Sequence, residues 1–119
     1  MKRVLLLDDD IDLCEIMREI VLELGASACT IVHSFDELKQ LPNIKNGFDL
    51  IFIDMNLGIS APSGIEVYKW LNEIGHNGKI AFFSGHDRSH PMIKLASVFP
   101  NVSIIEKPPS ESQLEALLR

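Results

Sequence analysis

The sequence is poor in cysteine, in clustered basic residues and in long apolar runs. Its two cysteines, Cys14 and Cys29, are too few and too far apart for a disulfide framework or a zinc site. No apolar segment approaches the ~20 residues of a membrane-spanning helix. The apolar run that follows Lys2 and Arg3 stops after four residues, which is too short for a secretory signal. These absences predict a soluble protein in the reducing cytoplasm.

Positive charge is also scarce. The 17 Asp and Glu residues outnumber the 11 Lys and Arg residues, so the net charge is −6, and the basic residues are scattered. Because nucleic acids and anionic membranes are bound by clustered positive charge, neither is expected as a direct partner. The 119 residues are 46% hydrophobic and 24% charged, which predicts one folded domain over residues 1–119.

Short apolar runs alternate with amphipathic segments along the chain. Five runs are too short for helices and are mainly apolar without alternation, which indicates parallel strands buried on both faces. The expected strands are residues 4–7, 29–32, 48–53, 80–83 and 102–105. The expected helices are residues 11–24, a short helix between Ser34 and Pro42, residues 65–74, residues 88–99 and a last helix after Ser110. This order predicts a flavodoxin-like α/β fold, a doubly wound parallel sheet of strand order 2-1-3-4-5 with helices on both faces.

Polar residues follow directly after four of these strands. They are Asp8, Asp9 and Asp10 after the first, Asp54 after the third, Ser84 after the fourth and Lys107 after the fifth. In open parallel sheets, ligands bind at the carboxyl ends of the strands, and strands one and three are neighbours in the predicted order. Clustered carboxylates repel one another unless they are protonated or hold a cation, and oxygen ligands of this kind suit Mg²⁺. A carboxylate can itself be a nucleophile, so the pattern points to phosphoryl transfer onto an aspartate.

The sequence resembles the CheY-like receiver domain of bacterial two-component response regulators over essentially its whole length. The matching motifs are Leu7-Asp8-Asp9-Asp10, Ile53-Asp54-Met55-Asn56-Leu57, Ser84-Gly85 and Glu106-Lys107-Pro108. The resemblance implies that Asp54 accepts a phosphoryl group from the phosphohistidine of a sensor kinase or a histidine phosphotransfer protein. It implies a signalling phosphoacceptor, either a monomer or a phosphorylation-dependent dimer, and not a conventional enzyme.

The resemblance also implies the site residues. For Mg²⁺ it implies Asp9, Asp54 and the backbone carbonyl of Asn56 as ligands, with Asp8 acting through water. For the phosphoryl group and the switch it implies Ser84, Lys107 and position 104, with a cis peptide bond before Pro108. Position 104 is Ile where the family usually has an aromatic residue, and the loop after Asp54 is longer than usual. Since Ile is stiff at χ1, we expect residues 84–90 to carry the response and Ile104 to move little.

Other interpretations remain open on the sequence alone. The acids of residues 8–10 also suit the capping of a following helix, and we expect Asp10 to have this role. Asp8-x-Asp10 resembles the nucleophile motif of haloacid-dehalogenase-type phosphatases, but the late acidic pair of that family is missing and Asp54 would have no role. A pseudo-receiver that binds partners without phosphorylation is a further alternative. His33 and His76 carry no functional signal in the sequence.

Overall fold

The computed structural model describes residues 2–55, 63–84, 94, 96, 98–100, 102–106 and 109–119. The strands are β1 (Arg3–Leu7), β2 (Ala28–Val32), β3 (Leu50–Asp54), β4 (Lys79–Ser84) and β5 (Val102–Glu106). The helices are α1 (Ile11–Glu23), α2 (Phe35–Lys39), α3 (Gly64–Glu73) and α5 (Glu111–Leu118). The expected helix over residues 88–99 lies mainly outside the described residues, although Lys94 and Ala96 are helical. Among the described helices, none is long and apolar enough to cross a membrane.

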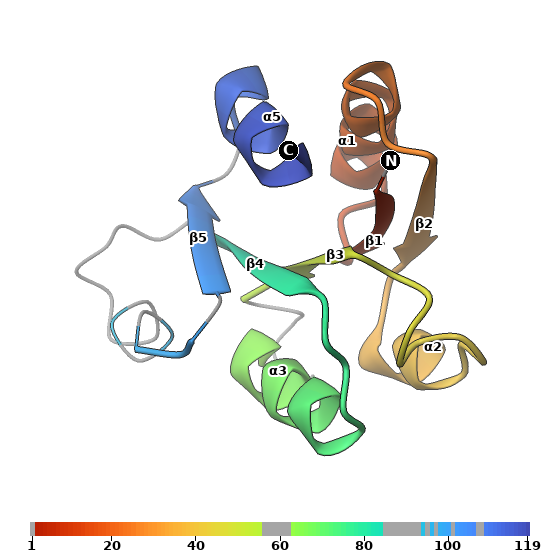
Figure 1. Ribbon diagram of the computed structural model, residues 1–119, viewed down its shortest axis with the longest axis vertical. Helices are drawn as coiled ribbons and strands as arrows, with labels where there is room; N and C mark the ends of the chain where they lie inside the picture. The colour runs from red at the N-terminus through yellow and green to blue at the C-terminus, as the bar shows by residue number, and fades with distance from the viewer. Residues whose placement is uncertain are drawn as a thin grey trace.

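All five strands are parallel and lie in the order β2-β1-β3-β4-β5 (Figure 1). Leu7, the last residue of β1, pairs with Val32 of β2 and with Ile53 of β3. On the other side of β3, Asp54 pairs with Phe83 of β4. The carboxyl ends of these strands therefore meet at one edge of the sheet. This confirms the predicted fold class and strand order.

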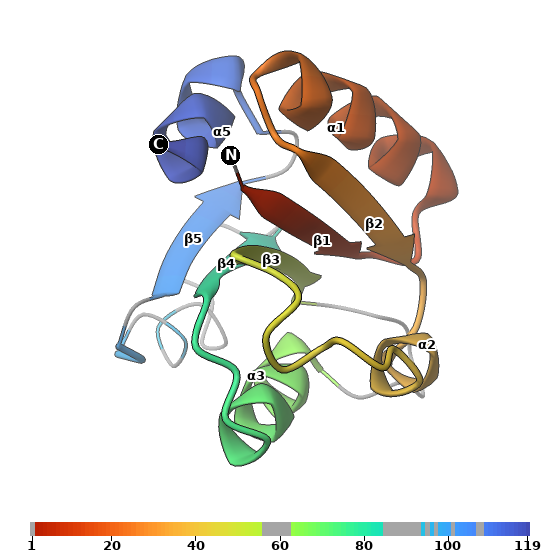
Figure 2. The same ribbon diagram turned by 45° about the vertical axis from the view of Figure 1, so that its right-hand side comes forward.

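Two apolar layers cover the sheet, one on each face. Successive strand residues alternate between them because side chains alternate along a strand. The layer beneath α2 and α3 includes Leu5, Leu7, Ile51, Ile53 and Phe82. The layer beneath α1 and α5 includes Val4, Leu6, Phe52, Ala81 and Phe83. Figures 1 and 2 show α1 and α5 on one face and α2 and α3 on the other. Burial on both faces explains why β1, β3 and β4 consist mainly of apolar residues, whereas the edge strands β2 and β5 are only partly buried and include Thr30 and Ser103.

An ion pair between Arg3 and Asp49 lies at the amino-terminal edge of the sheet. The carboxylate of Asp49 accepts hydrogen bonds from the Arg3 backbone N–H at 2.8 Å and from its guanidinium at 3.2 Å. Because the guanidinium lies beside it, the pKa of Asp49 falls to about 2. The backbone of Asp49 also bonds to Arg3 and to Lys79. β3 begins after Asp49 and ends at Asp54, so the strand expected over residues 48–53 is shifted by one to two residues.

Side chains cap α1, α2 and α5, and the cap of α1 by Asp10 confirms the prediction. The side chain of Asp10 accepts the Leu13 N–H at 3.1 Å and begins α1, and Ser110 with Gln113 forms a complete capping box before α5. At α2 the Ser34 hydroxyl accepts the Glu37 N–H. The carboxylate of Glu37, however, accepts a hydrogen bond from the backbone N–H of His33 at 2.9 Å, whereas a capping box would use the N–H of Ser34. This extends the cap to the residue that follows β2.

A buried histidine makes the stability of the fold depend on pH. His76 follows α3, and its Nδ1 lies 3.3 Å from the Lys45 carbonyl oxygen. Burial lowers the pKa of His76 from 6.5, so the unfolded chain binds a proton first as pH falls. We expect the free energy of unfolding to decrease as pH drops through 6.5 toward that lowered pKa. Urea unfolding from about pH 8 to about pH 5 measures this, and in His76→Gln the slope should become shallower. An unchanged slope in the variant would contradict the assignment.

Candidate functional site

The candidate site lies at the carboxyl edge of the sheet, where β1, β3 and β4 end. Asp8 directly follows β1, while Asp54 and Ser84 are the last residues of β3 and β4. The side chains of all three are buried, with exposed fractions of 3%, 4% and 2%. Asp9 is exposed. Two carboxylates and a hydroxyl are therefore withdrawn from solvent at neighbouring strand ends, at the position where such sheets bind ligands.

The carboxylates of Asp8, Asp9 and Asp54 form a compact group. Each offers one oxygen, and these three oxygens lie within 4.8 Å of one another. At this separation ionised carboxylates repel by several kcal/mol at an effective dielectric of about 20. A divalent cation relieves the repulsion, and a set made only of oxygen ligands suits a hard ion such as Mg²⁺. The residues present therefore fit the metal expected from the sequence.

The backbone after β1 places these acids and keeps Asp10 apart from them. The Asp8 N–H donates to the Val32 carbonyl at 3.2 Å, which continues the β1–β2 pairing by one residue. The Asp10 N–H then donates to Oδ1 of Asp8 at 2.9 Å, forming a tight turn. Since Asp10 caps α1, its carboxylate is occupied by the helix, as predicted. The three consecutive aspartates thus have different surroundings.

Asp54 is fixed by the elements on both sides of it. The next residue, Met55, donates its N–H to the Phe83 carbonyl at 2.9 Å, and its own carbonyl accepts the Gly64 N–H at 3.2 Å. Gly64 is the first residue of α3. A Cβ atom at this position would lie 2.8 Å from the Asp54 carbonyl oxygen and 3.0 Å from the Met55 Cα. Only glycine allows the helix to approach this closely without displacing the backbone.

The structure describes Ser84 and Ile104 among the other predicted site residues. Ser84 lies at the end of β4, next to the strand that carries Asp54. Ile104 lies within β5, pairs with Phe82, and packs half-buried against the layer beneath α2 and α3. Asn56, Lys107, Pro108 and residues 85–90 lie outside the described residues. The structure therefore brings Asp8, Asp9 and Asp54 together and places Ser84 nearby.

One residue beside the site was missed by the sequence analysis. His33 follows β2, and its Nδ1 lies 3.0 Å from the backbone carbonyl oxygen of Asp8. The same carbonyl oxygen lies 3.5 Å from the Cys14 thiol. The contact follows from the register of β1 and β2. Because Leu7 pairs with Val32, the next residues of the two strands, Asp8 and His33, are neighbours. The apolar pattern predicts the strand but not this register.

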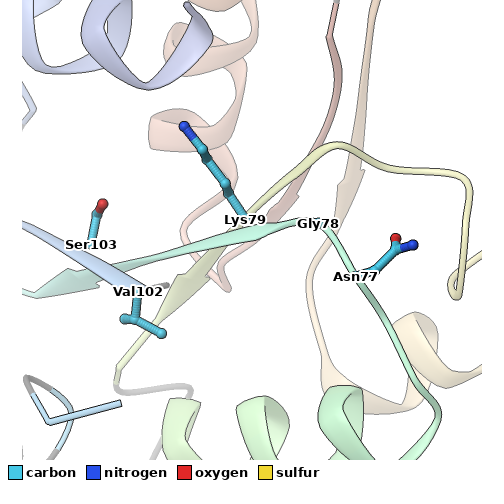
Figure 3. Close-up of a pocket in the computed structure, with 5 residues that line it drawn as sticks. All are labelled: Asn77, Gly78, Lys79, Val102 and Ser103. Carbon is cyan, nitrogen blue, oxygen red and sulfur yellow. The ribbon is translucent and has the colours of Figure 1, made fainter. Parts of the chain in front are cut away.

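A pocket of about 290 Å³ lies at the opposite, amino-terminal edge of the sheet. It is lined by Asn77, Gly78, Lys79, Val102 and Ser103. In Figure 3, Lys79 and Ser103 point to one face of the sheet and Val102 to the other. These side chains do not converge on a common point, so this pocket offers no arrangement comparable with the acidic group.

Comparison with known proteins gives one consistent family. The response regulator receiver domain matches the sequence over residues 4–119. No curated protein is similar enough in sequence to count as a match. A CheY-like receiver domain from Methylobacillus flagellatus is 25% identical with a TM-score of 0.78, covering 99% of this chain and 96% of that one. A receiver domain from Clostridium thermocellum is 16% identical with a TM-score of 0.80, covering 99% and 91%. The Francisella response regulator 1452 receiver domain is 24% identical with a TM-score of 0.78, covering 98% and 92%.

Proposed function

Because this chain belongs to the response regulator receiver domain family, we propose that it is a phosphoacceptor in which Asp54 takes a phosphoryl group from a phosphohistidine. One observation carries the proposal: Asp54 is buried at the end of β3, within 4.8 Å of oxygens from Asp8 and Asp9. This places the proposed nucleophile beside acids that suit a divalent cation. Residues 1–119 act as a single receiver unit in this proposal.

The chemistry is a phosphoryl transfer between two side chains. An Asp54 carboxylate oxygen attacks the phosphorus, the phosphorus–nitrogen bond of the donor breaks, and its electron pair returns to the imidazole ring. The products are an aspartyl phosphate and a free histidine. Positioning and electrostatic stabilisation are the main sources of rate in such transfers. The backbone bonds of Met55 to Phe83 and Gly64 contribute to the positioning, because they hold the backbone next to Asp54.

Mg²⁺, when bound, supplies positive charge to the transferring phosphoryl oxygens. In this proposal its ligands are Asp9, Asp54 and the backbone carbonyl of Asn56, with Asp8 acting through water. The burial of Asp8 and the exposure of Asp9 are consistent with this division. The turn bond from the Asp10 N–H to Oδ1 of Asp8 supports it further, since that oxygen already has a donor.

The switch uses residues at the ends of β4 and β5. Phosphorylation adds about −1.5 to −2 charge to a site that already holds three carboxylates, so hydrogen-bond donors must approach it. The Ser84 hydroxyl is the donor on the neighbouring strand, and Lys107 supplies the cation. Ile104 contributes less movement than an aromatic residue because its branched side chain is packed against the core.

The partners follow from this chemistry. The phosphoryl donor is a sensor histidine kinase or a histidine phosphotransfer protein in the cytoplasm, and the chain is a monomer or a phosphorylation-dependent dimer. The chain promotes only its own phosphorylation and dephosphorylation and is otherwise not an enzyme. The phosphatase alternative is disfavoured because Asp10, the second acid of its motif, caps α1.

A phosphate mimic tests the function and separates it from a pseudo-receiver. We expect beryllofluoride with Mg²⁺ to shift the backbone amide NMR signals of Asp54, Met55 and Ser84. Mg²⁺ alone should shift the signals of the acidic turn at residues 8–10 and of Asp54, its other carboxylate ligand in this proposal. Fluoride with Mg²⁺ but without beryllium is the matched control and should reproduce the Mg²⁺ spectrum. If beryllofluoride adds no shifts to that spectrum, the chain does not form a phosphoaspartate-like state and the proposal fails.

A further inference from the structure

The carbonyl group of Asp8 is held by side chains from two other elements. It accepts a hydrogen bond from Nδ1 of His33 at 3.0 Å and lies 3.5 Å from the Cys14 thiol of α1. A carbonyl oxygen can only accept, so Nδ1 of His33 carries the hydrogen. The peptide that joins Asp8 to Asp9 is therefore restrained at its oxygen. This peptide sets the direction in which both acids leave the backbone.

His33 is itself held in place. Its backbone N–H donates to Oε2 of Glu37 at 2.9 Å, as part of the cap of α2. It directly follows Val32, whose carbonyl accepts the Asp8 N–H at 3.2 Å. The backbone that carries the imidazole thus belongs to a hydrogen-bonded junction between β2 and α2. A rigid donor of this kind orients the group that it contacts, as partners of metal ligands generally do.

We infer that His33 is a positioning residue that sets the Mg²⁺ affinity of the acidic group by orienting the Asp8–Asp9 peptide. This inference rests on the proposed function, since it assumes that the acids bind Mg²⁺. His33 does not touch the metal or the phosphoryl group in this role. It acts through the carbonyl of Asp8, which lies on the side of β2, while the carboxylates of Asp8 and Asp9 gather with Asp54 at the end of β3.

Two substitutions separate positioning from simple packing. His33→Asn keeps an N–H donor at the same number of bonds from the backbone as Nδ1, whereas His33→Leu keeps volume and loses the donor. We expect Leu to weaken Mg²⁺ binding by about tenfold and Asn to restore most of the affinity, in line with other partners of metal ligands. The affinity is read from a Mg²⁺ titration of the amide NMR signals of residues 8–10. Urea unfolding without Mg²⁺ should change little in either variant, because residue 33 is only half-buried.

The outcomes distinguish the two proposals. If His33→Leu binds Mg²⁺ as tightly as the native chain, the positioning role is wrong and the proposed function stands. If Asn and Leu weaken binding equally, the donor is irrelevant and the role is again wrong. If the native chain binds no Mg²⁺, both proposals fail. His33→Gln, which presents its amide one bond farther out, provides a second polar comparison and should bind Mg²⁺ less tightly than the Asn variant, so the test does not depend on the stability of the Leu variant.

Discussion

We expect Asp54→Asn to abolish phosphorylation. With a small phosphodonor and Mg²⁺, the mass of the intact native chain should increase by one phosphoryl group, and the variant should show no increase. In asparagine an amide nitrogen replaces one carboxylate oxygen and the side chain is neutral, so no carboxylate nucleophile remains at the end of β3. The shape of the side chain is kept, and the bonds of Met55 to Phe83 and Gly64 should persist. The loss is therefore chemical and not a failure to fold.

Asp49→Asn is the matched control, because Asp49 precedes the opposite end of the same strand. This change removes the ion pair with Arg3 at the amino-terminal edge, although the side-chain oxygen can still accept the Arg3 backbone N–H, and it leaves the carboxyl edge unchanged. We expect normal phosphorylation in this variant and a small loss of stability. Labelling of Asp54→Asn to the native extent would show that another residue accepts the phosphoryl group. Loss of labelling in both variants would mean that the strand itself, and not the nucleophile, is responsible.

Asp9→Asn should reduce Mg²⁺ affinity more than any change outside the acidic group. Asp9 is one of the three carboxylates within 4.8 Å, and its loss removes both a ligand and a charge. Changes at residues that only orient a metal ligand cost about 10–100-fold, so removal of the ligand should cost more. Isothermal titration with Mg²⁺ measures the difference.

Asp10→Asn removes the same charge one residue farther along and serves as the control. Its side chain caps α1 through the Leu13 N–H, and asparagine caps almost as well as aspartate. We therefore expect a small loss of stability and only a minor change in Mg²⁺ affinity. If the two variants lose Mg²⁺ affinity equally, the assignment of Asp9 as the ligand is wrong and the effect is one of net charge.

The strand order and the location of the acidic group could be predicted because both depend on strong signals. Strands buried on both faces leave uninterrupted apolar runs, and in a parallel sheet the residue after each run must lie at the same edge. Asp8 and Asp54 follow such runs, so their meeting required no knowledge of side-chain packing. The role of Asp10 was predictable for a similar reason, since helix capping is decided within one turn of the chain.

The contacts that depend on register could not be predicted. When both faces of a strand carry apolar residues, a shift of one residue still places apolar side chains on each face, so the hydrophobic pattern specifies the register only weakly. The contact between His33 and the Asp8 carbonyl depends on the pairing of Leu7 with Val32. The capping bond of Glu37 was displaced by one residue for a related reason, because its direction depends on how β2 leads into α2.

The close approach of Gly64 to Asp54 has a mechanical consequence. No side chain separates the first turn of α3 from the peptide of Asp54, since a Cβ at Gly64 would lie 2.8 Å from that carbonyl oxygen. Closely packed backbones are nearly incompressible, so they cannot absorb a displacement as a pliable side chain would. A small shift of the end of β3 would therefore move the first turn of α3 with it. The added methyl group of Gly64→Ala would have no space there, so it would displace the start of α3 or the Asp54 peptide in the unmodified chain.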